Sequence, residues 1–323
     1  MTPPPSDHFN GKTFFYPSVP SAGGYLDLLR WKLFSRPARW PDRVPLDPSP
    51  PPPRPAPHGP ALAATWIGHS TYLLQTTHGN FLTDPVFSER TSPVAWAGPR
   101  RVHPPGLAFA DLPPIDVVLL SHDHYDHCDL PSLRRLAAVH HPLFITPLRH
   151  ADLLRAAGAR QIVELDWWQT HSLAASAGPA HVTLTPSRHW SNRLGSPRNH
   201  RLWGGFALTL GSHRLWFAGD SGYDRALFHT IRERCGAPDI ALIPIGAYEP
   251  RWFMAPMHMN PVEAVQTHRD VGARLSLAMH WGTFQLTDED RDAPPLALAA
   301  ARAAAGLPDE AFKVVAPGAS VTV

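Results

Sequence analysis

Ser-His-Asp-His-Tyr-Asp-His, residues 121–127, places three imidazoles and the carboxylate of Asp126 within six residues, directly after an apolar run. That run, residues 115–120, reads Ile-Asp-Val-Val-Leu-Leu and is typical of a buried strand. An extended continuation of the strand puts His122 and His124 on the same side of the backbone. The two imidazoles can therefore share one cation.

Asp126 and His127 follow where the chain turns into a helix expected over residues 129–139, with Asp129 as its N-cap. The turn changes the direction in which both side chains point, so they suit a second cation nearby. Zinc, iron and manganese all accept imidazole and carboxylate, whereas structural zinc more often uses cysteine, of which the chain has only two. Solvated loop histidines are the alternative, but they do not explain four ligand-type side chains at a strand-to-helix junction.

Three more ligand-type residues follow β-rich segments further along the chain. His189 comes after residues 181–185, Asp220 after residues 214–219 and His280 after residues 274–279. Taken singly, each histidine reads as a core or surface residue, and Asp220 as a turn aspartate. Together with the cluster, they form the order HxHxDH, His, Asp, His.

This order resembles the metallo-β-lactamase-fold hydrolases over about residues 61–290. Further stretches are similar to the N-acylphosphatidylethanolamine-hydrolysing phospholipase D family, and they occupy residues 65–71, 81–87, 164–168, 217–223, 243–254 and 280–284. The resemblance implies an α/β fold of the four-layered αββα sandwich type. It also implies two zinc ions, the first bound by His122, His124 and His189, the second by Asp126, His127 and His280, with Asp220 bridging them.

The resemblance implies phospholipase D-type cleavage of a phospholipid such as N-acylphosphatidylethanolamine, releasing an N-acylethanolamine and phosphatidic acid. Two cations held in this way would activate a water molecule, so no protein nucleophile is needed. Asp126, Asp220 and His258 are the expected catalytic residues. The family has a histidine at the place of His258, close to the substrate phosphate, but the polar residue that precedes it there is Met257 here.

Asp84 and His69 are candidates for orienting the metal ligands, although turn and core roles fit them equally well. Two other functions stay open from the residues alone. A hydrolase with the same metals could cleave a lactone, an amide or a small phosphodiester. A protein without hydrolytic activity could hold a redox di-iron centre or be a metal-stabilised scaffold, since iron accepts the same ligands.

The composition fits one catalytic domain, expected over residues 61–323, because 323 residues with 43% hydrophobic content can bury a large core. A net charge of +2 without a long basic block argues against nucleic-acid binding. The sequence shows no signal segment and no apolar run of about 20 residues, so a cytoplasmic protein is expected. Cys128 is expected to be a packing residue and not a metal ligand. The sequence leaves the oligomeric state open, and a homo-oligomer is compatible with it.

Residues 1–60 form an N-terminal extension of different character. Half of the positions from 41 to 60 are proline, which favours an extended strap. Before it, residues 25–34 can form a short helix with an apolar side (Leu26, Leu29, Leu33 and Phe34) and basic residues elsewhere. Such a helix can dock on the hydrolase domain or lie in a membrane interface, and the two roles are compatible.

The remaining pattern predicts alternating strands and helices. Strands are expected near residues 62–67, 71–76, 80–83, 115–121, 181–185, 205–210, 213–218 and 240–245. Helices are expected near residues 129–139, 148–157, 223–234, 260–271 and 295–305.

Overall fold

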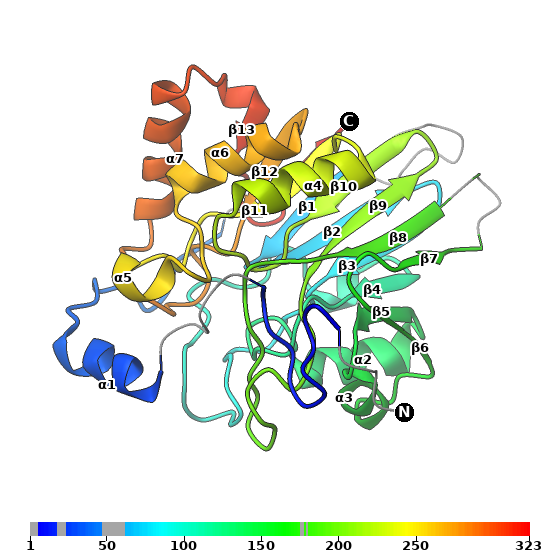
Figure 1. Ribbon diagram of the computed structural model, residues 1–323, viewed down its shortest axis with the longest axis horizontal. Coiled ribbons are helices and arrows are strands. Elements are labelled where there is room, and N and C mark those ends of the chain that lie inside the picture. Colours follow the sequence, from blue (N-terminus) through cyan, green and yellow to red (C-terminus); the bar gives the residue numbers. More distant parts are fainter. Residues whose placement is uncertain (1–5, 18–23, 47–61, 175–177, 179) are drawn as a thin grey trace.

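Two seven-stranded sheets pack face to face in the computed structural model, and helices cover their outer faces (Figure 1). The structure describes residues 6–17, 24–46, 62–174, 178 and 180–323. The predicted four-layered αββα sandwich is confirmed. One apolar core lies between the sheets, and it includes Trp66, Phe81, Phe206 and Phe217, all fully buried.

The first sheet has the strand order β14-β1-β2-β3-β4-β5-β6, and β3 to β6 run parallel to one another. Its strands are β1 (Ala63–Gly68), β2 (Thr71–Thr76), β3 (Gly79–Thr83), β4 (Val117–Leu119), β5 (Leu143–Pro147), β6 (Gln161–Leu165) and β14 (Ser320–Thr322). Helices α2 (Leu130–Val139) and α3 (Ala151–Ala156) lie on its outer side (Figure 1).

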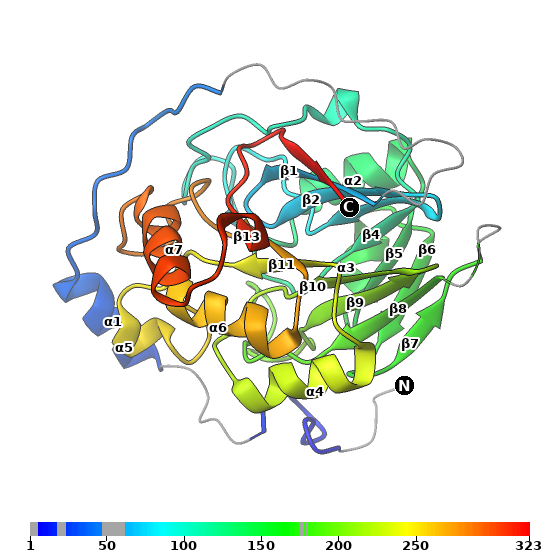
Figure 2. The same cartoon turned by 90° about the horizontal axis from the view of Figure 1, so that it is seen from above.

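The second sheet has the order β13-β12-β11-β10-β9-β8-β7, with β10 to β13 parallel. Its strands are β7 (Thr170–Ser172), β8 (Ala180–Thr185), β9 (Gly205–Leu210), β10 (His213–Phe217), β11 (Ile240–Pro244), β12 (Leu275–Met279) and β13 (Phe312–Lys313). Its outer face is covered by α4 (Arg225–Cys235), α6 (Pro261–Val271) and α7 (Ala293–Ala304) (Figure 2).

Most expected elements are present, and their ends shift by a few residues. The strand expected over 115–121 is shorter, because only Val117–Leu119 pairs with its neighbours. The helix expected over 148–157 is also shorter and spans Ala151–Ala156. Strands β5, β6, β7, β13 and β14 were not expected, nor were helix α5 (Arg251–Met254) and the short 3₁₀ helices η1 (Phe109–Asp111) and η2 (Asp309–Ala311).

The N-terminal extension contacts the sandwich at two places. Residues 6–17 place Phe9 and Phe14 in the main core, and the Phe14 amide donates to the carbonyl of Asn199. Helix α1 (Tyr25–Phe34) lies beside α5 (Figures 1 and 2). Much of the proline-rich strap, residues 47–61, lies outside the described residues, and within those residues no helix has the length and apolar character needed to cross a bilayer.

Candidate metal centre

The candidate ligands lie where strands of both sheets end. The segment 121–127 follows β4, Asp220 follows β10, and His280 follows β12 directly. His189 lies in the loop from β8 to β9, four residues past the end of its strand. Because the carboxyl ends of parallel strands meet at one edge of a sheet, residues more than 150 positions apart converge there.

His122, His124 and His189 form the first group, as predicted for one cation. Nε2 of His122 is 2.9 Å from Nδ1 of His124, and Nε2 of His189 is 3.3 Å from the same atom. His189 donates its other ring nitrogen, Nδ1, to the carbonyl of Met257 at 3.0 Å. That hydrogen bond fixes the ring and leaves the lone pair of Nε2 pointing into the group.

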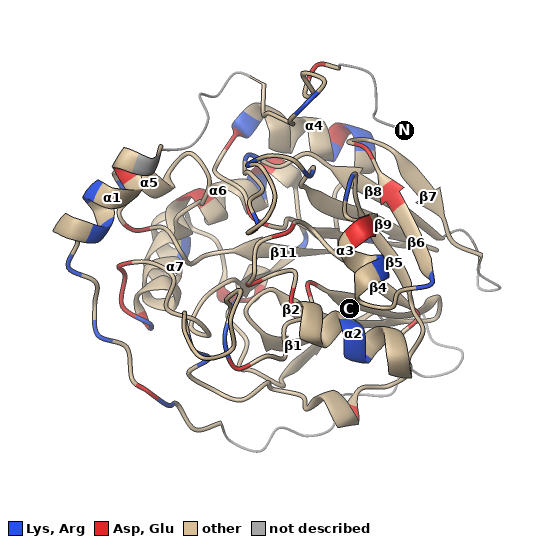
Figure 3. Ribbon diagram, turned by 90° about the horizontal axis from the view of Figure 1, so that it is seen from below, with Lys and Arg blue, Asp and Glu red and all other residues tan. Residues whose placement is uncertain are grey.

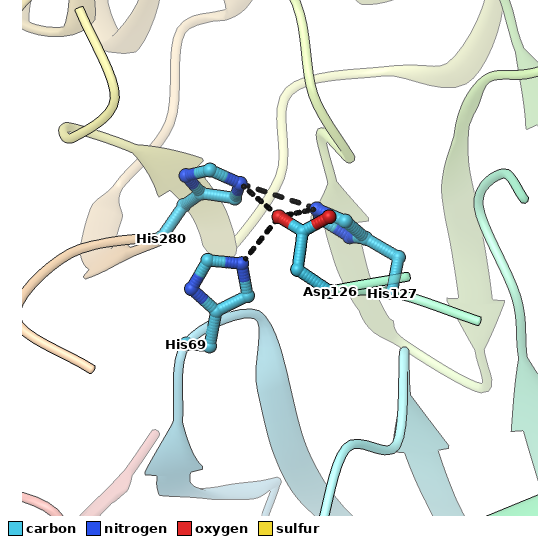
Figure 4. Close-up of side chains that lie close together, drawn as sticks. All are labelled: His69, Asp126, His127 and His280. Carbon is cyan, nitrogen blue, oxygen red and sulfur yellow. Dashed lines mark hydrogen bonds and ion pairs between the residues drawn. The ribbon is translucent and has the colours of Figure 1, made fainter. Parts of the chain in front are cut away.

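Asp126, His127 and His280 form the second group, and His69 joins them (Figure 4). Asp126 Oδ2 lies 3.3 Å from Nε2 of His280 and 3.4 Å from Nε2 of His127. The same oxygen lies 2.9 Å from Nε2 of His69. Its hydrogen bond orients the Asp126 carboxylate, which is one of the two roles expected for His69.

Asp220 lies between the two groups. Its Oδ2 atom is 3.1 Å from Nε2 of His127 and 3.2 Å from Nε2 of His280 in the second group. In the first group, it is 3.7 Å from His189 and 3.8 Å from His122. This is the position that a bridging carboxylate would take. The other oxygen, Oδ1, is buried and has no hydrogen-bond partner among the described residues.

Asp84 stabilises the centre by accepting hydrogen bonds from a candidate ligand and from Ser121. Its Oδ2 atom accepts from Nδ1 of His127 at 2.6 Å and from the hydroxyl of Ser121, while Oδ1 accepts from the Ser121 amide at 2.7 Å. A carboxylate on the far nitrogen of a histidine is the usual arrangement behind a metal ligand. Of the two roles considered for Asp84, the orienting one therefore agrees with its contacts.

Burial and charge make the donor set suitable for cations. Burial lowers the pKa of His122 and His189 well below the usual range, which keeps both imidazoles neutral and their lone pairs available. Burial would raise the pKa of Asp220, but the attraction of His127 and His280 lowers it well below the usual range. Burial would lower the pKa of His127 and His280, but the neighbouring carboxylates raise that of His127 well above its usual range and that of His280 to about 9, so these two rings hold protons that bound cations would replace. Neutral imidazoles in the first group, together with buried, ionised carboxylates, fit divalent metal ions.

His258 lies next to the centre. Its Nδ1 atom is 4.0 Å from Asp220 Oδ2, and its ring stands edge-on to His189, with ring centroids 5.0 Å apart. Burial lowers the pKa of His258 to about 4, so the ring is neutral at pH 7. The expected helix start after it is confirmed, since Asn260 and Glu263 form a capping box at the start of α6.

A cavity of about 460 Å³ opens above the centre. Its floor includes His124, Asp126, Asp220, His258 and His280. The outer wall is largely apolar and comes from α1, α5 and the chain that follows it, with Leu28, Trp31, Phe253, Met254 and Met257. Met257, the residue at which the chain departs from the phospholipase pattern, thus packs in an apolar wall, 3% exposed.

Helix α1 docks through a different side from the one expected. Trp31 is buried against Phe253 and donates its indole N–H to Asp288 at 2.9 Å. The expected apolar side, by contrast, is largely exposed, with Leu26 and Phe34 nearly four-fifths accessible. The cavity residues Tyr125, Trp190 and Asn192 were not expected from the sequence, although Trp190 directly follows a candidate ligand.

The chain resembles known proteins in both sequence and fold. Residues 79–281 match the family model described as the beta-lactamase superfamily domain. The chain is 39% identical over 231 residues to an N-acyl-phosphatidylethanolamine-hydrolyzing phospholipase D 1 of Caenorhabditis elegans, a match that covers 70% of this chain. It is 37% identical over 227 residues, again 70% of the chain, to the mitochondrial N-acyl-phosphatidylethanolamine-hydrolyzing phospholipase D of Saccharomyces cerevisiae.

The two matches cover 65% and 48% of those relatives' own lengths, less than two thirds of either. Among solved structures, an isothiocyanate hydrolase from Delia radicum gut bacteria has a TM-score of 0.63 at 21% identity. That similarity covers 80% of this chain and 98% of the hydrolase. At this identity, the structural likeness concerns the fold alone.

Proposed function

Because the chain belongs to the beta-lactamase superfamily, we propose that it is a metal-dependent phosphodiester hydrolase acting on N-acylphosphatidylethanolamine or a related phospholipid. The products are an N-acylethanolamine and a phosphatidic acid. The observation that carries the proposal is the cavity that joins the histidine and aspartate floor to an apolar wall. Such a cavity suits a substrate with a charged reacting group and long hydrocarbon chains. The names of the two phospholipase relatives agree with it.

The proposed cofactor is a pair of Zn²⁺ ions, although iron and manganese accept the same donors. His122, His124 and His189 would hold one ion, Asp126, His127 and His280 the other, and Asp220 both. When bound, the pair activates water as a nucleophile and offsets the negative charge of a phosphoryl group. Asp84 and His69 keep the His127 ring and the Asp126 carboxylate in their orientations.

The chain's own residues around the reacting group have distinct roles in this proposal. Asp126 and Asp220 supply the negative charge that retains the cations. His258, neutral and in the cavity floor, donates a hydrogen bond from a ring N–H to the phosphoryl group or to the leaving oxygen. The apolar wall excludes water from the acyl chains.

The division into an extension (residues 1–60) and a catalytic domain (residues 61–323) is part of the proposal. The proposal also includes contact between the exposed side of α1 and a membrane surface. Leu26, Leu33 and Phe34 are exposed there, and Arg30 and Lys32 are exposed on the same helix. The basic positions of α1 are blue in Figure 3. Apolar side chains next to basic ones suit the interface of an anionic bilayer. Cytoplasmic location and homo-oligomer formation stay predictions.

The test is elemental analysis of the protein as purified, followed by an assay, before and after loading with zinc, on three substrates: N-acylphosphatidylethanolamine in mixed micelles, bis(4-nitrophenyl) phosphate and a neutral lactone. We expect release of N-acylethanolamine together with two metal ions per chain by elemental analysis. Lactone turnover without lipid turnover would defeat the phospholipase assignment. Stoichiometric iron without hydrolysis of any substrate would favour the di-iron alternative.

Membrane contact has its own test, since it can fail while hydrolysis is present. Leu26, Leu33 and Phe34 are replaced together by Ser, and co-sedimentation with phosphatidylglycerol-containing vesicles is measured. We expect binding to fall by about 10-fold or more, from the loss of buried apolar area. Unchanged binding would rule out this role of α1.

A further inference from the structure

One guanidinium lies in the wall of the cavity above the candidate metal centre. Arg198 is the only lysine or arginine among the described residues that line this cavity. The surroundings on the α1 and α5 side are apolar, with Leu28, Phe253 and Met254. A cation beside such a surface interacts with a charged ligand more strongly than it would in open water.

Trp190 connects Arg198 to the centre. The guanidinium carbon of Arg198 lies 4.2 Å from the centroid of the Trp190 ring. The same indole stands edge-on to the ring of His124, with centroids 4.7 Å apart. A single aromatic ring therefore separates the cation from a candidate metal ligand, and the stacking restricts where the cation can lie.

The loop that carries both residues is closed by hydrogen bonds. The Asn199 amide donates to the Ser191 carbonyl at 2.8 Å, and the Ser191 amide donates to Asn199 Oδ1 at 3.2 Å. Trp190 and Arg198 are the residues that precede Ser191 and Asn199, so this pairing holds them close together. The Asn192 amide donates to Asp123 Oδ1 at 2.9 Å, which ties the loop to the segment between His122 and His124.

We propose that Arg198 determines specificity by recognising the negative charge of the substrate's phosphoryl group, so that anionic phosphodiesters are selected over neutral esters and lactones. A guanidinium presents two parallel N–H groups that match the oxygens of a phosphate. A phosphodiester carries this charge before cleavage, and the phosphatidic acid product retains it. Neutral substrates of the same size gain nothing from the cation. This inference rests on the proposed phosphodiester hydrolysis and names the group that reads the phosphate.

The experiment compares Arg198→Gln and Arg198→Lys with the wild type, all loaded with zinc. Arg160→Gln is the matched control, because Arg160 is an exposed arginine outside the cavity. Steady-state kinetics are measured on N-acylphosphatidylethanolamine, bis(4-nitrophenyl) phosphate and neutral 4-nitrophenyl acetate. Binding of dihexanoylphosphatidate and of neutral dihexanoylglycerol is measured by calorimetry, which needs no turnover.

We expect Arg198→Gln to raise KM for both phosphodiesters by about 10-fold or more, since a charge-assisted pair is lost. Affinity for dihexanoylphosphatidate should fall by a similar factor. Values for 4-nitrophenyl acetate and dihexanoylglycerol should stay within about twofold, because neither ligand carries a charge for Arg198 to pair with. The KM and affinity values of Arg198→Lys should lie between those of the wild type and Arg198→Gln, since lysine keeps the charge but lacks the two parallel N–H groups. Arg160→Gln should match the wild type.

Two results would overturn the inference. Equal losses on anionic and neutral ligands, with a lower melting temperature, would make Arg198 a structural partner of Trp190. Unchanged affinity for dihexanoylphosphatidate would remove any role in phosphate recognition. Failure of the proposed function would give a different result. The protein would not cleave N-acylphosphatidylethanolamine, yet Arg198→Gln would still lower the affinity for dihexanoylphosphatidate and not the affinity for dihexanoylglycerol.

Discussion

The floor of the cavity and its outer wall differ in how they are held. In the floor, Asp220 is 2% exposed, and charged or hydrogen-bonded neighbours surround it on several strand ends. In the wall, Trp31 is the one buried side chain among those of α1 that the structure describes, while Leu26 on the same helix is 78% exposed. The floor can therefore be disturbed only by breaking a network, whereas the wall can be loosened by one substitution.

This difference separates the chemistry from the selection of the substrate. The floor is built from both sheets, so its geometry follows from the fold itself. The wall is added by an N-terminal segment and by α5, and a change there should alter which molecules fit without altering bond cleavage. The predictions below test this separation.

The largest effect is expected from Asp220→Asn in the floor. Removing the charge between the two ligand groups should lower turnover of every substrate by a factor on the order of 10³ or more, because both cations lose a ligand. Elemental analysis should show fewer than two metal ions per chain. Asp111→Asn, at an exposed carboxylate in η1, is the control and should keep both activity and metal. Full activity of Asp220→Asn would contradict the assignment of the floor.

Metal removal should destabilise the floor and leave the wall in place. A ligand present at 100 to 1,000 times its Kd stabilises the folded state by about 3 to 4 kcal/mol, so chelation should lower the free energy of unfolding by that order. Tryptophan fluorescence after urea titration measures the change. Zinc added back should restore it, whereas magnesium should not, because the donors are mainly imidazoles. Equal stability with and without chelator would argue against bound metal.

Trp31→Ala tests the wall. Loss of the contact with Phe253 and of the hydrogen bond to Asp288 should release α1. We expect KM for N-acylphosphatidylethanolamine to rise by about 10-fold from lost apolar contact, and turnover of bis(4-nitrophenyl) phosphate to stay within about twofold. Trp96→Ala, at a tryptophan that is 81% exposed, is the matched control. Parallel losses on both substrates would show that wall and floor are not separable.

The smallest effect concerns His8, which anchors the other part of the extension. Burial lowers its pKa, but hydrogen bonds to Asp166 and Asp7 outweigh it, so the pKa is raised above 6.5. The stabilisation is therefore complete below pH 6.5 and is lost as the pH rises through the folded-state pKa. His8→Gln should cost about 1 kcal/mol at pH 5.5 and less at pH 9.

Urea unfolding of the wild type and His8→Gln at both pH values measures this difference. His141→Gln, at an exposed histidine outside this contact, is the control. If His8→Gln lowered the free energy of unfolding more at pH 9 than at pH 5.5, the predicted direction of the pH dependence would be wrong. Hydrolysis should be unaffected, since His8 lies outside the residues that line the cavity.

Local sequence patterns predicted the elements whose signals are local. The bounds of β9 and α1 agree with the expected residues 205–210 and 25–34, because a continuous apolar run or a helical period marks each. Strand β7, Thr170–Ser172, is short and polar and lies at a sheet edge, so it carries no such signal. Strand β14 becomes a strand by pairing with β1, some 250 residues away, which no local window can detect.

The candidate site shows the same limit. The HxHxDH spacing and the strand-following His189, Asp220 and His280 could be read from the sequence, since the chemistry of metal ligands restricts residue type and order. The position of Arg198 in the cavity could not be read from the sequence. It depends on a loop closed by Ser191 and Asn199 and on stacking against Trp190, contacts that exist only in the folded chain.

The sequence by itself determined an α/β fold and the residue types able to hold cations, because strand periodicity and ligand chemistry act over short stretches. The four-layered sandwich was implied by the resemblance of its motifs to the metallo-β-lactamase-fold hydrolases. Only the tertiary structure decided that His69 joins the second ligand group, that α1 docks through Trp31 and not through its leucine side, and that Met257 is part of an apolar wall. Each of these depends on which distant surfaces meet. Burial of one side of a short helix is settled by the partner it packs against, and that partner lies more than 200 residues away in the chain.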